Sequence, residues 1–229
     1  MPDHEHVYNR QAHLYDQMIS RQPSLLPALL RIRPLEGLDM VDTGAGTGRL
    51  AAVLAPFAHT LAVFDRSEAM LHLTRQKLVP PLSTEKLRYG TADHRCLPVG
   101  DSTADLITAG WTVCYLASSN HADWQIALER TLAEFRRILR PGGTIVILET
   151  MGTGTDGPQA PDFLTGYYQQ LENTYGFTFS LLPMDYTFES VEEAVELTEF
   201  FFGEALSRQV RAKGVPVVRE WAGMWTLTV

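Results

Sequence analysis

The alternation of short apolar runs with helix-like stretches between residues 38 and 150 constrains the fold of this chain most. Short apolar runs stand at residues 38–44, 60–65, 87–93 and 104–110, and a Pro-Gly-Gly turn leads into another within 140–150. Stretches of helical character separate them, at residues 48–57, 67–78 and 121–139. Strands that alternate with helices predict an α/β domain with a mostly parallel sheet and helices on both faces.

Local signals predict where several elements begin and end. Ser67 is the expected N-cap of the helix over 67–78, and Ser190 followed by Glu193 forms a capping box at the start of a helix over 190–203. The Gly-, Pro- and Asp-rich stretch at 151–163 predicts a surface loop, residues 185–188 predict a short strand, and 221–229 predict a final strand.

Charge and cysteine content limit the partners of the chain. The 229 residues carry a net charge of −8, with an isoelectric point near 5.3, which disfavours binding to a nucleic-acid backbone. The two cysteines, Cys96 and Cys114, do not make a disulfide framework. No signal-peptide pattern is present, and no apolar run reaches the ~18 residues that span a bilayer. We expect a cytoplasmic monomer or homodimer that binds neither nucleic acid nor membrane.

A glycine-rich turn follows the first predicted strand. The segment VDTGAGTGRL, residues 41–50, contains Gly44, Gly46 and Gly48. Ligands of open α/β sheets bind at the carboxyl ends of the strands, and glycine lets the backbone approach them closely. The dinucleotide fingerprint reads G-x-G-x-x-G, but here the third glycine comes one place early and Arg49 holds the last position. The spacing therefore disfavours a nicotinamide or flavin dinucleotide.

Three acids end three successive predicted strands: Asp42, Asp65 and Asp93. A carboxylate after the second strand can accept hydrogen bonds from both hydroxyls of a ribose, and one after the third strand can accept a bond from an adenine amine. Three carboxylates would repel a pyrophosphate. The acids therefore favour a cationic adenosyl cofactor that carries no phosphate.

The segment from residue 38 to residue 150 resembles the core of class I S-adenosylmethionine-dependent methyltransferases, in particular small-molecule enzymes of the ubiquinone and menaquinone biosynthesis type. VDTGAGTG looks like the first motif of that family, AVFDRSEAML like its ribose-binding motif, GTADHRCLPVGDSTADLI like its adenine-binding stretch, and RILRPGGTIVILE like its fifth-strand motif. The resemblance implies a Rossmann-like seven-stranded sheet whose last strand is antiparallel. It also implies S-adenosyl-L-methionine as cofactor and S-adenosyl-L-homocysteine as product.

The resemblance further implies a single methyltransferase domain over residues 1–229. Residues 1–36 would form lid helices, 37–150 the cofactor-binding core, and 151–229 the loop, helices and strands that complete the acceptor site. Asp65 would hold the ribose, Asp93 the adenine, Met70 the adenine face, and Asp42 the turn or the cofactor amine. The implied cofactor-binding residues are Tyr8, Tyr15, Asp42, Gly44, Ala45, Gly46, Gly48, Asp65, Arg66, Met70, Ala92, Asp93, His94, Ala109 and Gly110.

The acceptor site is harder to predict, because methyl transfer expels a neutral thioether and alignment alone can supply much of the acceleration. The expected acceptor-site residues follow strands four and five or lie in the tail: Trp111, Cys114, Tyr115, Glu149 and Tyr168. His121 is the candidate general base, because imidazole titrates near neutral pH. The stretch AGWTVCYL, residues 109–116, lacks the proline pair typical of enzymes that methylate adenine or glutamine amide nitrogens.

Two other functions stay open on the sequence. A non-catalytic S-adenosylmethionine-binding regulator would keep the same turn, and an NAD(P)-dependent oxidoreductase would use a similar sheet, although the glycine spacing disfavours it. We expect no metal site. His4 and His6 form an H-x-H pair in a polar terminal stretch, and the other five histidines show no ligand spacing.

Overall fold

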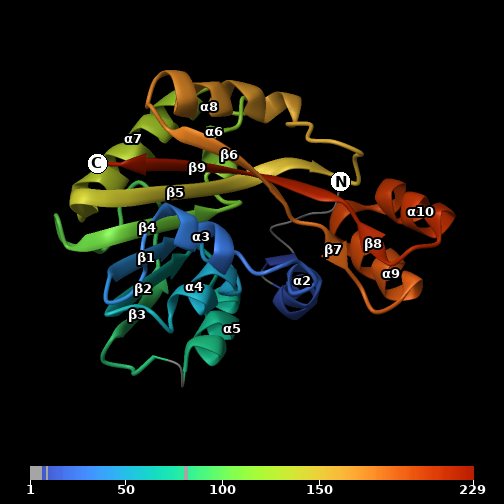
Figure 1. Ribbon diagram of the computed structural model, residues 1–229, viewed down its shortest axis with the longest axis horizontal. Helices are drawn as coiled ribbons and strands as arrows, with labels where there is room; N and C mark the ends of the chain where they lie inside the picture. Colours follow the sequence, from blue (N-terminus) through green and yellow to red (C-terminus); the bar gives the residue numbers. More distant parts are fainter. Residues whose placement is uncertain (1–6, 9, 80–81) are drawn as a thin grey trace.

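A computed structural model describes residues 7–8, 10–79 and 82–229 of the chain, so that His4 and His6 lie outside the described residues. Its centre is a seven-stranded sheet with the strand order β3-β2-β1-β4-β5-β9-β6 (Figure 1). The strands are β1 (Asp39–Thr43), β2 (Thr60–Asp65), β3 (Leu87–Thr91), β4 (Ala104–Gly110), β5 (Leu139–Thr153), β6 (Thr178–Pro183) and β9 (Glu220–Thr228).

Strands β1 to β5 are parallel to one another, and β9 runs antiparallel between β5 and β6. This confirms the predicted sheet with an antiparallel last strand. The chain adds β2 and β3 on one side of β1 and then returns to place β4 on the other side. The resulting switch point between β1 and β4 is where open α/β sheets bind ligands.

Helices cover both faces of the sheet (Figure 1). One face carries α3 (Leu26–Ile32), α4 (Arg49–Leu54) and α5 (Glu68–Leu78), and the other carries α6 (Cys114–Ala117), α7 (Trp124–Ile138) and α8 (Asp162–Asn173). Alternate residues of β5 divide between them, because Val146 and Leu148 pack into the first core while Ile145 and Ile147 pack into the second. The two-residue period of a strand therefore supplies both cores from one apolar run.

A smaller unit caps the end of the sheet where the parallel strands finish (Figure 1). It contains α2 (Ala12–Ile19), α9 (Val191–Phe202), α10 (Glu204–Lys213) and the two-stranded sheet of β7 (Tyr186–Thr187) and β8 (Val217–Val218). Met18 and Ile19 of α2 share an apolar core with Leu197 of α9 and Tyr186 of β7. Residues from both ends of the chain thus build one cap over the carboxyl edge of the sheet.

The predicted capping signals are present. Ser67 accepts a hydrogen bond from the Met70 backbone at the start of α5 (3.4 Å), and Ser190 accepts one from Glu193 at the start of α9 (3.1 Å). The Glu193 carboxylate closes the box on the backbone N–H of Glu189 (2.7 Å), one residue before the cap. None of the described helices is long and apolar enough to cross a bilayer.

Two predictions about the chain after residue 139 are wrong in detail. The expected turn at Pro141–Gly143 and the first residues of the expected loop at 151–163 both belong to β5, which runs from Leu139 to Thr153. Its amino end extends because Leu139 pairs with Ala104 of β4, and its carboxyl end because Thr153 pairs with Glu220 of β9. Strand β6 is not predicted from the sequence, because its side chains are mostly exposed and its strand conformation comes from pairing with β9.

Candidate active site

A cavity of about 380 Å³ lies at the carboxyl ends of β1, β2 and β4, beneath the cap. That volume suits a small organic ligand. Fourteen residues expected at the cofactor or acceptor site line it: Tyr8, Tyr15, Asp42, Gly44, Ala45, Gly46, Asp65, Arg66, Met70, Asp93, His94, Gly110, Trp111 and Tyr115.

The glycine turn forms the floor of this cavity. All three of its glycines have a positive φ, and at two of them a Cβ would also clash with a neighbouring side chain. Gly44 has a φ of +64°, and a Cβ there would lie 2.0 Å from Thr112 Oγ1. Gly48 is the N-cap of α4 with a φ of +86°, and a Cβ there would lie 2.9 Å from Thr74 Cγ2. The turn is therefore packed closely on β4 and α5 while its backbone faces the cavity.

Asp65 ties the turn to the second strand. One carboxylate oxygen accepts the Gly46 backbone N–H at 2.8 Å and the other accepts the Ser67 backbone N–H at 2.8 Å. A carboxylate offers about four lone-pair directions, so each oxygen can still accept a bond from a ligand. Burial raises the pKa of Asp65, and the two backbone donors oppose that shift.

Asp42 lies deeper and is incompletely paired. Thr108 donates to its Oδ1 at 2.7 Å, while Oδ2 is buried and has no hydrogen-bond partner among the described residues. Burial, with a smaller contribution from the neighbouring Asp65 charge, raises the pKa of Asp42 to about 7. An unpaired buried carboxylate oxygen on the wall of a cavity is complementary to a positively charged ligand group.

The third acid is arranged differently from the sequence expectation. Asp93 lies two residues beyond β3, in a tight turn bridged to Cys96, rather than at the end of the strand. Its carboxylate forms a bidentate pair with Arg95 at 2.8 and 2.7 Å, and that pairing lowers the pKa of Asp93 to about 2. Asp93 still lines the cavity, as an ionised and already paired acceptor.

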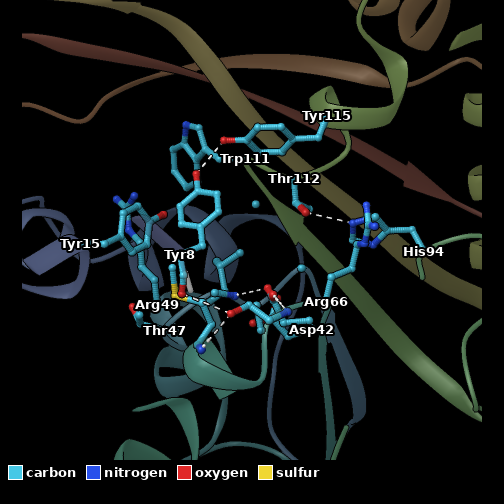
Figure 2. Close-up of a pocket in the computed structure, with 18 of the residues that line it drawn as sticks. Tyr8, Tyr15, Asp42, Thr47, Arg49, Arg66, His94, Trp111, Thr112 and Tyr115 are labelled. Carbon is cyan, nitrogen blue, oxygen red and sulfur yellow. Dashed lines mark hydrogen bonds between the residues drawn. The ribbon is translucent and has the colours of Figure 1, made fainter. Parts of the chain in front are cut away.

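His94 links this turn to the rest of the site. Its Nδ1 is 2.7 Å from Thr43 Oγ1 and its Nε2 is 2.9 Å from Thr112 Oγ1 (Figure 2). Burial lowers the pKa of His94 to about 4, so the ring is neutral at pH 7 and accepts one of these bonds while donating the other. His94 therefore joins the ends of β1 and β4 as a fixed polar wall.

Aromatic residues of the cap close the cavity from above. The Tyr8 hydroxyl lies 2.6 Å from that of Tyr115, which follows β4 (Figure 2). The Tyr15 ring packs 5.3 Å from Tyr8 and 5.3 Å from Phe201 of α9. The roof of the cavity is thus formed jointly by the amino-terminal segment, the segment after β4 and the carboxyl-terminal cap.

The helix that carries Tyr15 is fixed to the glycine turn. Asp16 of α2 accepts a hydrogen bond from Thr47 at 2.6 Å and pairs with Lys77 of α5. Thr47 is fully buried on the turn. The position of the lid is therefore coupled directly to the loop that forms the cavity floor.

Arg49, the first residue of α4, extends into the cavity beside Tyr15 (Figure 2). Its guanidinium carbon lies 4.4 Å from the centre of the Trp111 ring, a cation–π arrangement. Its Nη2 is buried without a hydrogen-bond partner among the described residues. The residue that breaks the dinucleotide fingerprint is thus a buried cation facing the cavity.

Comparisons with known proteins agree with this arrangement. Residues 41–147 match the family described as methyltransferase domain. The chain is 30% identical over 169 residues to a malonyl-[acyl-carrier protein] O-methyltransferase of Pectobacterium atrosepticum, a match covering 73% of this chain and 58% of the relative. It is 30% identical over 157 residues to a ubiquinone/menaquinone biosynthesis C-methyltransferase of Teredinibacter turnerae, covering 67% and 53%. Residues 41–147 therefore match a methyltransferase domain, and the chain is similar to class I methyltransferases.

The fold is also shared with solved structures. A crystal structure of a SAM-dependent methyltransferase from Aquifex aeolicus matches with a TM-score of 0.59 at 15% identity, over 95% of this chain and 97% of that one. The alignments span between about half and three fifths of the length of the curated relatives above. These comparisons lend no support to an oxidoreductase or to a non-catalytic regulator.

The residues of the cavity fit the family's cofactor, S-adenosylmethionine. The unpaired Oδ2 of Asp42 meets the need of a cationic ligand for a buried negative group, and the free lone pairs of Asp65 suit two ribose hydroxyls. Met70 is buried and lines the cavity, where its flexible thioether can pack against a flat adenine. The cofactor would supply an electrophilic methyl group, and the protein would supply its position.

Several expected site residues are not among those that line the cavity. Ala109 is fully buried, Gly48 caps α4, and Ala92 follows β3 without facing the cavity wall. Glu149 is fully buried behind the site, where it accepts the Cys114 backbone N–H at 2.9 Å. This bond fixes the start of α6 and makes the carboxylate a support for the loop after β4.

Three further candidates lie away from the cavity, and one of them, Cys114, is the first residue of α6 and is not among the residues that line it. Tyr168 packs 4.4 Å from the Trp225 ring and donates to the Thr150 carbonyl at 2.8 Å, so its hydroxyl is used inside the second core. His121 is exposed before α7, and its backbone N–H bonds to the Ser118 carbonyl. The geometry therefore gives His121 no support as a general base.

Seven cavity residues were not expected from the sequence: Ile19, Thr47, Arg49, Leu50, Ser67, Thr112 and Leu116. Two had a readable signal. Arg49 is a charged residue at a position where the helix packs on a strand. A charge there predicts either a strained contact or a functional side chain. Thr112 follows the fourth strand by two positions, at the switch point. Its neighbour Trp111 is an expected acceptor-site residue because of the same position.

Proposed function

We propose that the chain transfers a methyl group from S-adenosylmethionine to a small-molecule acceptor by in-line displacement. The observation that carries this proposal is the cavity at the switch point of the sheet, where Asp42 keeps an unpaired buried oxygen and Asp65 keeps free acceptor positions beside the glycine turn. This wall is complementary to a cation with a ribose, and its buried carboxylates disfavour a pyrophosphate.

In this proposal the cofactor lies over residues 44–46 with its ribose on Asp65 and its adenine between Met70 and the turn around His94. The backbone after Gly110 faces the amino-acid end. The acceptor enters on the side of Trp111 and Tyr115, under the lid that Tyr8 and Tyr15 form. Tyr8 and α2 then act as the lid, and α9 and α10 complete the cap, within a single domain. The other parts of the expected lid and acceptor segments, such as α3 and α8, pack on the sheet instead.

No general base is required by the proposal. The aromatic enclosure excludes water and aligns the nucleophile, which can contribute on the order of several kcal/mol to the barrier. Because one relative is named an O-methyltransferase and another a C-methyltransferase, the proposal covers oxygen and carbon nucleophiles.

Both cysteines are free thiols, which supports a reducing compartment such as the cytoplasm. We also propose that the protein is a monomer or a homodimer.

The experiment that tests the proposal measures cofactor binding and turnover together. Thermal shifts with S-adenosylhomocysteine and with NADH separate a methyltransferase from an oxidoreductase, and we expect stabilisation only by the former. Release of S-adenosylhomocysteine from S-adenosylmethionine is then followed with a panel of phenols, quinols and carboxylic acids. Acceptor-dependent turnover is the expected result. Tight cofactor binding with no turnover on any acceptor would favour the non-catalytic regulator instead.

A further inference from the structure

The charges around the cavity are unevenly distributed. Asp42 and Asp65 supply negative charge at the ends of β1 and β2, whereas Asp93, in the turn after β3, is paired with Arg95. Two arginines line the same cavity, and Arg66 is exposed at its rim while Arg49 lies inside, beside Tyr15 and across the view from His94 (Figure 2). Among the described residues that line the cavity, Arg49 is therefore the cationic side chain that lies inside it and not at its rim.

Arg49 is held in place, and the buried Glu220 carboxyl interacts with its charge but forms no ion pair with it. Its guanidinium stacks 4.4 Å from the Trp111 ring centre, which fixes the plane of the group. None of the ion pairs formed by the described residues includes Arg49, and its Nη2 is buried without a partner there. A buried guanidinium that stays charged is costly unless an anion pairs with it.

We propose that Arg49 is the carboxylate-binding residue of the cavity. A stacked guanidinium presents its N–H edge in a fixed fork, and that edge matches a carboxylate better than a single point charge does. The carboxylate belongs either to the amino-acid end of the cofactor or to the acceptor, and the two sources are separable by experiment. This inference rests on the proposed function, since both sources are ligands of the methyl-transfer site.

The arrangement on either side of the turn supports this role. Asp42 Oδ2 and Arg49 Nη2 are both buried, both unpaired, and both on residues that line one cavity. One is complementary to an ammonium and the other to a carboxylate. A ligand that carries both an ammonium and a carboxylate would therefore give each of these buried atoms a partner of opposite charge.

The test compares wild type with Arg49→Gln and Arg49→Lys by isothermal titration calorimetry. S-Adenosylhomocysteine, which carries the amino-acid carboxylate, is paired with 5′-methylthioadenosine, which lacks it. Benzoate and benzamide are then titrated into protein saturated with S-adenosylhomocysteine. Arg75→Gln is the matched control, because Arg75 also stacks on an aromatic ring, 5.0 Å from the centre of Tyr89, on the exposed surface.

If the cofactor supplies the carboxylate, Arg49→Gln weakens S-adenosylhomocysteine more than tenfold and leaves 5′-methylthioadenosine unchanged. If the acceptor supplies it, both adenosyl ligands keep their affinity, and the preference of wild type for benzoate over benzamide disappears in Arg49→Gln. In either case Arg49→Lys retains part of the effect and Arg75→Gln none. The melting temperature of each variant shows whether it is folded.

The proposal is overturned if folded Arg49→Gln changes neither the adenosyl pair nor the benzoate pair, since Arg49 would then only support Trp111. The same conclusion follows if wild type shows no preference for benzoate and Arg49→Gln leaves S-adenosylhomocysteine unaffected. A wild type that binds neither adenosyl ligand contradicts the proposed function instead, and the benzoate pair is then measured on the free protein.

Discussion

Replacing Asp65 with alanine is expected to weaken S-adenosylhomocysteine binding by at least about tenfold. Each Asp65 oxygen accepts one backbone N–H, from Gly46 and from Ser67, both at 2.8 Å, and keeps a lone pair for the cavity. A hydrogen bond to a charged group contributes about 1.5–3 kcal/mol. Since about 1.4 kcal/mol is a factor of ten, the loss of one ribose contact corresponds to about 10- to 150-fold in the dissociation constant.

The same substitution has a second effect that has to be separated from the first. It leaves two part-buried backbone N–H groups without their acceptor, and each costs on the order of 1–3 kcal/mol of stability. Asp65→Asn retains one oxygen for the turn but loses the charge that strengthens the ribose contacts. It should therefore recover much of the melting temperature while binding remains weak.

Calorimetric titration of S-adenosylhomocysteine into wild type, Asp65→Ala and Asp65→Asn measures the effect, with melting curves for each protein. Asp156→Ala, at an exposed acid in the loop before α8, is the control for loss of one negative charge. A folded Asp65→Asn or Asp65→Ala protein with the dissociation constant of wild type would refute the reasoning. It would mean that the acid holds only the turn.

Three other perturbations follow from the same geometry. Gly44→Ala should abolish S-adenosylhomocysteine binding, because the added Cβ would lie 2.0 Å from Thr112 Oγ1. The control Gly37→Ala, at a similar φ with open space around it, should cost only about 1–2 kcal/mol of stability. Equal S-adenosylhomocysteine binding by both variants would contradict the predicted clash. Tyr115→Phe removes the 2.6 Å contact with Tyr8 and should raise the dissociation rate of S-adenosylhomocysteine about fivefold in stopped-flow measurements, an unchanged rate arguing against a lid. The Asp42 carboxyl has a pKa raised from 3.8 to about 7 in the free protein, so its protonated form favours folding, and this contribution is lost as pH rises from about 4 to 7. Conversely, ionised Asp42 favours a cationic ligand, so S-adenosylmethionine should bind more tightly at pH 8 than at pH 6 in wild type but equally in Asp42→Asn.

The cofactor side of the site could be predicted from the sequence because its parts are short and contiguous. The glycine turn, Asp65 and Met70 each sit in one strand-to-helix connection, and the parallel sheet brings those connections to one edge. A glycine pattern and an acid at a strand end therefore specify position as well as residue type.

The acceptor side could not be predicted in the same way. Whether a residue faces the cavity depends on tertiary packing. Glu149 of β5 and Tyr168 of α8 were both expected at the acceptor site, yet their side chains form hydrogen bonds inside the protein. The lid is built from Tyr8, Tyr115 and Phe201, which are brought together only by tertiary packing. Periodicity carries no information about such contacts.

The central claim is that the cavity at the switch point holds S-adenosylmethionine with its ribose on Asp65 and its sulfonium toward the aromatic wall. A crystal structure of the protein with S-adenosylhomocysteine tests it most directly. We predict both ribose hydroxyls within about 3.2 Å of the Asp65 carboxylate and the sulfur facing the side of Trp111 and Tyr115. A ligand bound outside this cavity, or a ribose with no contact to Asp65, would contradict the account.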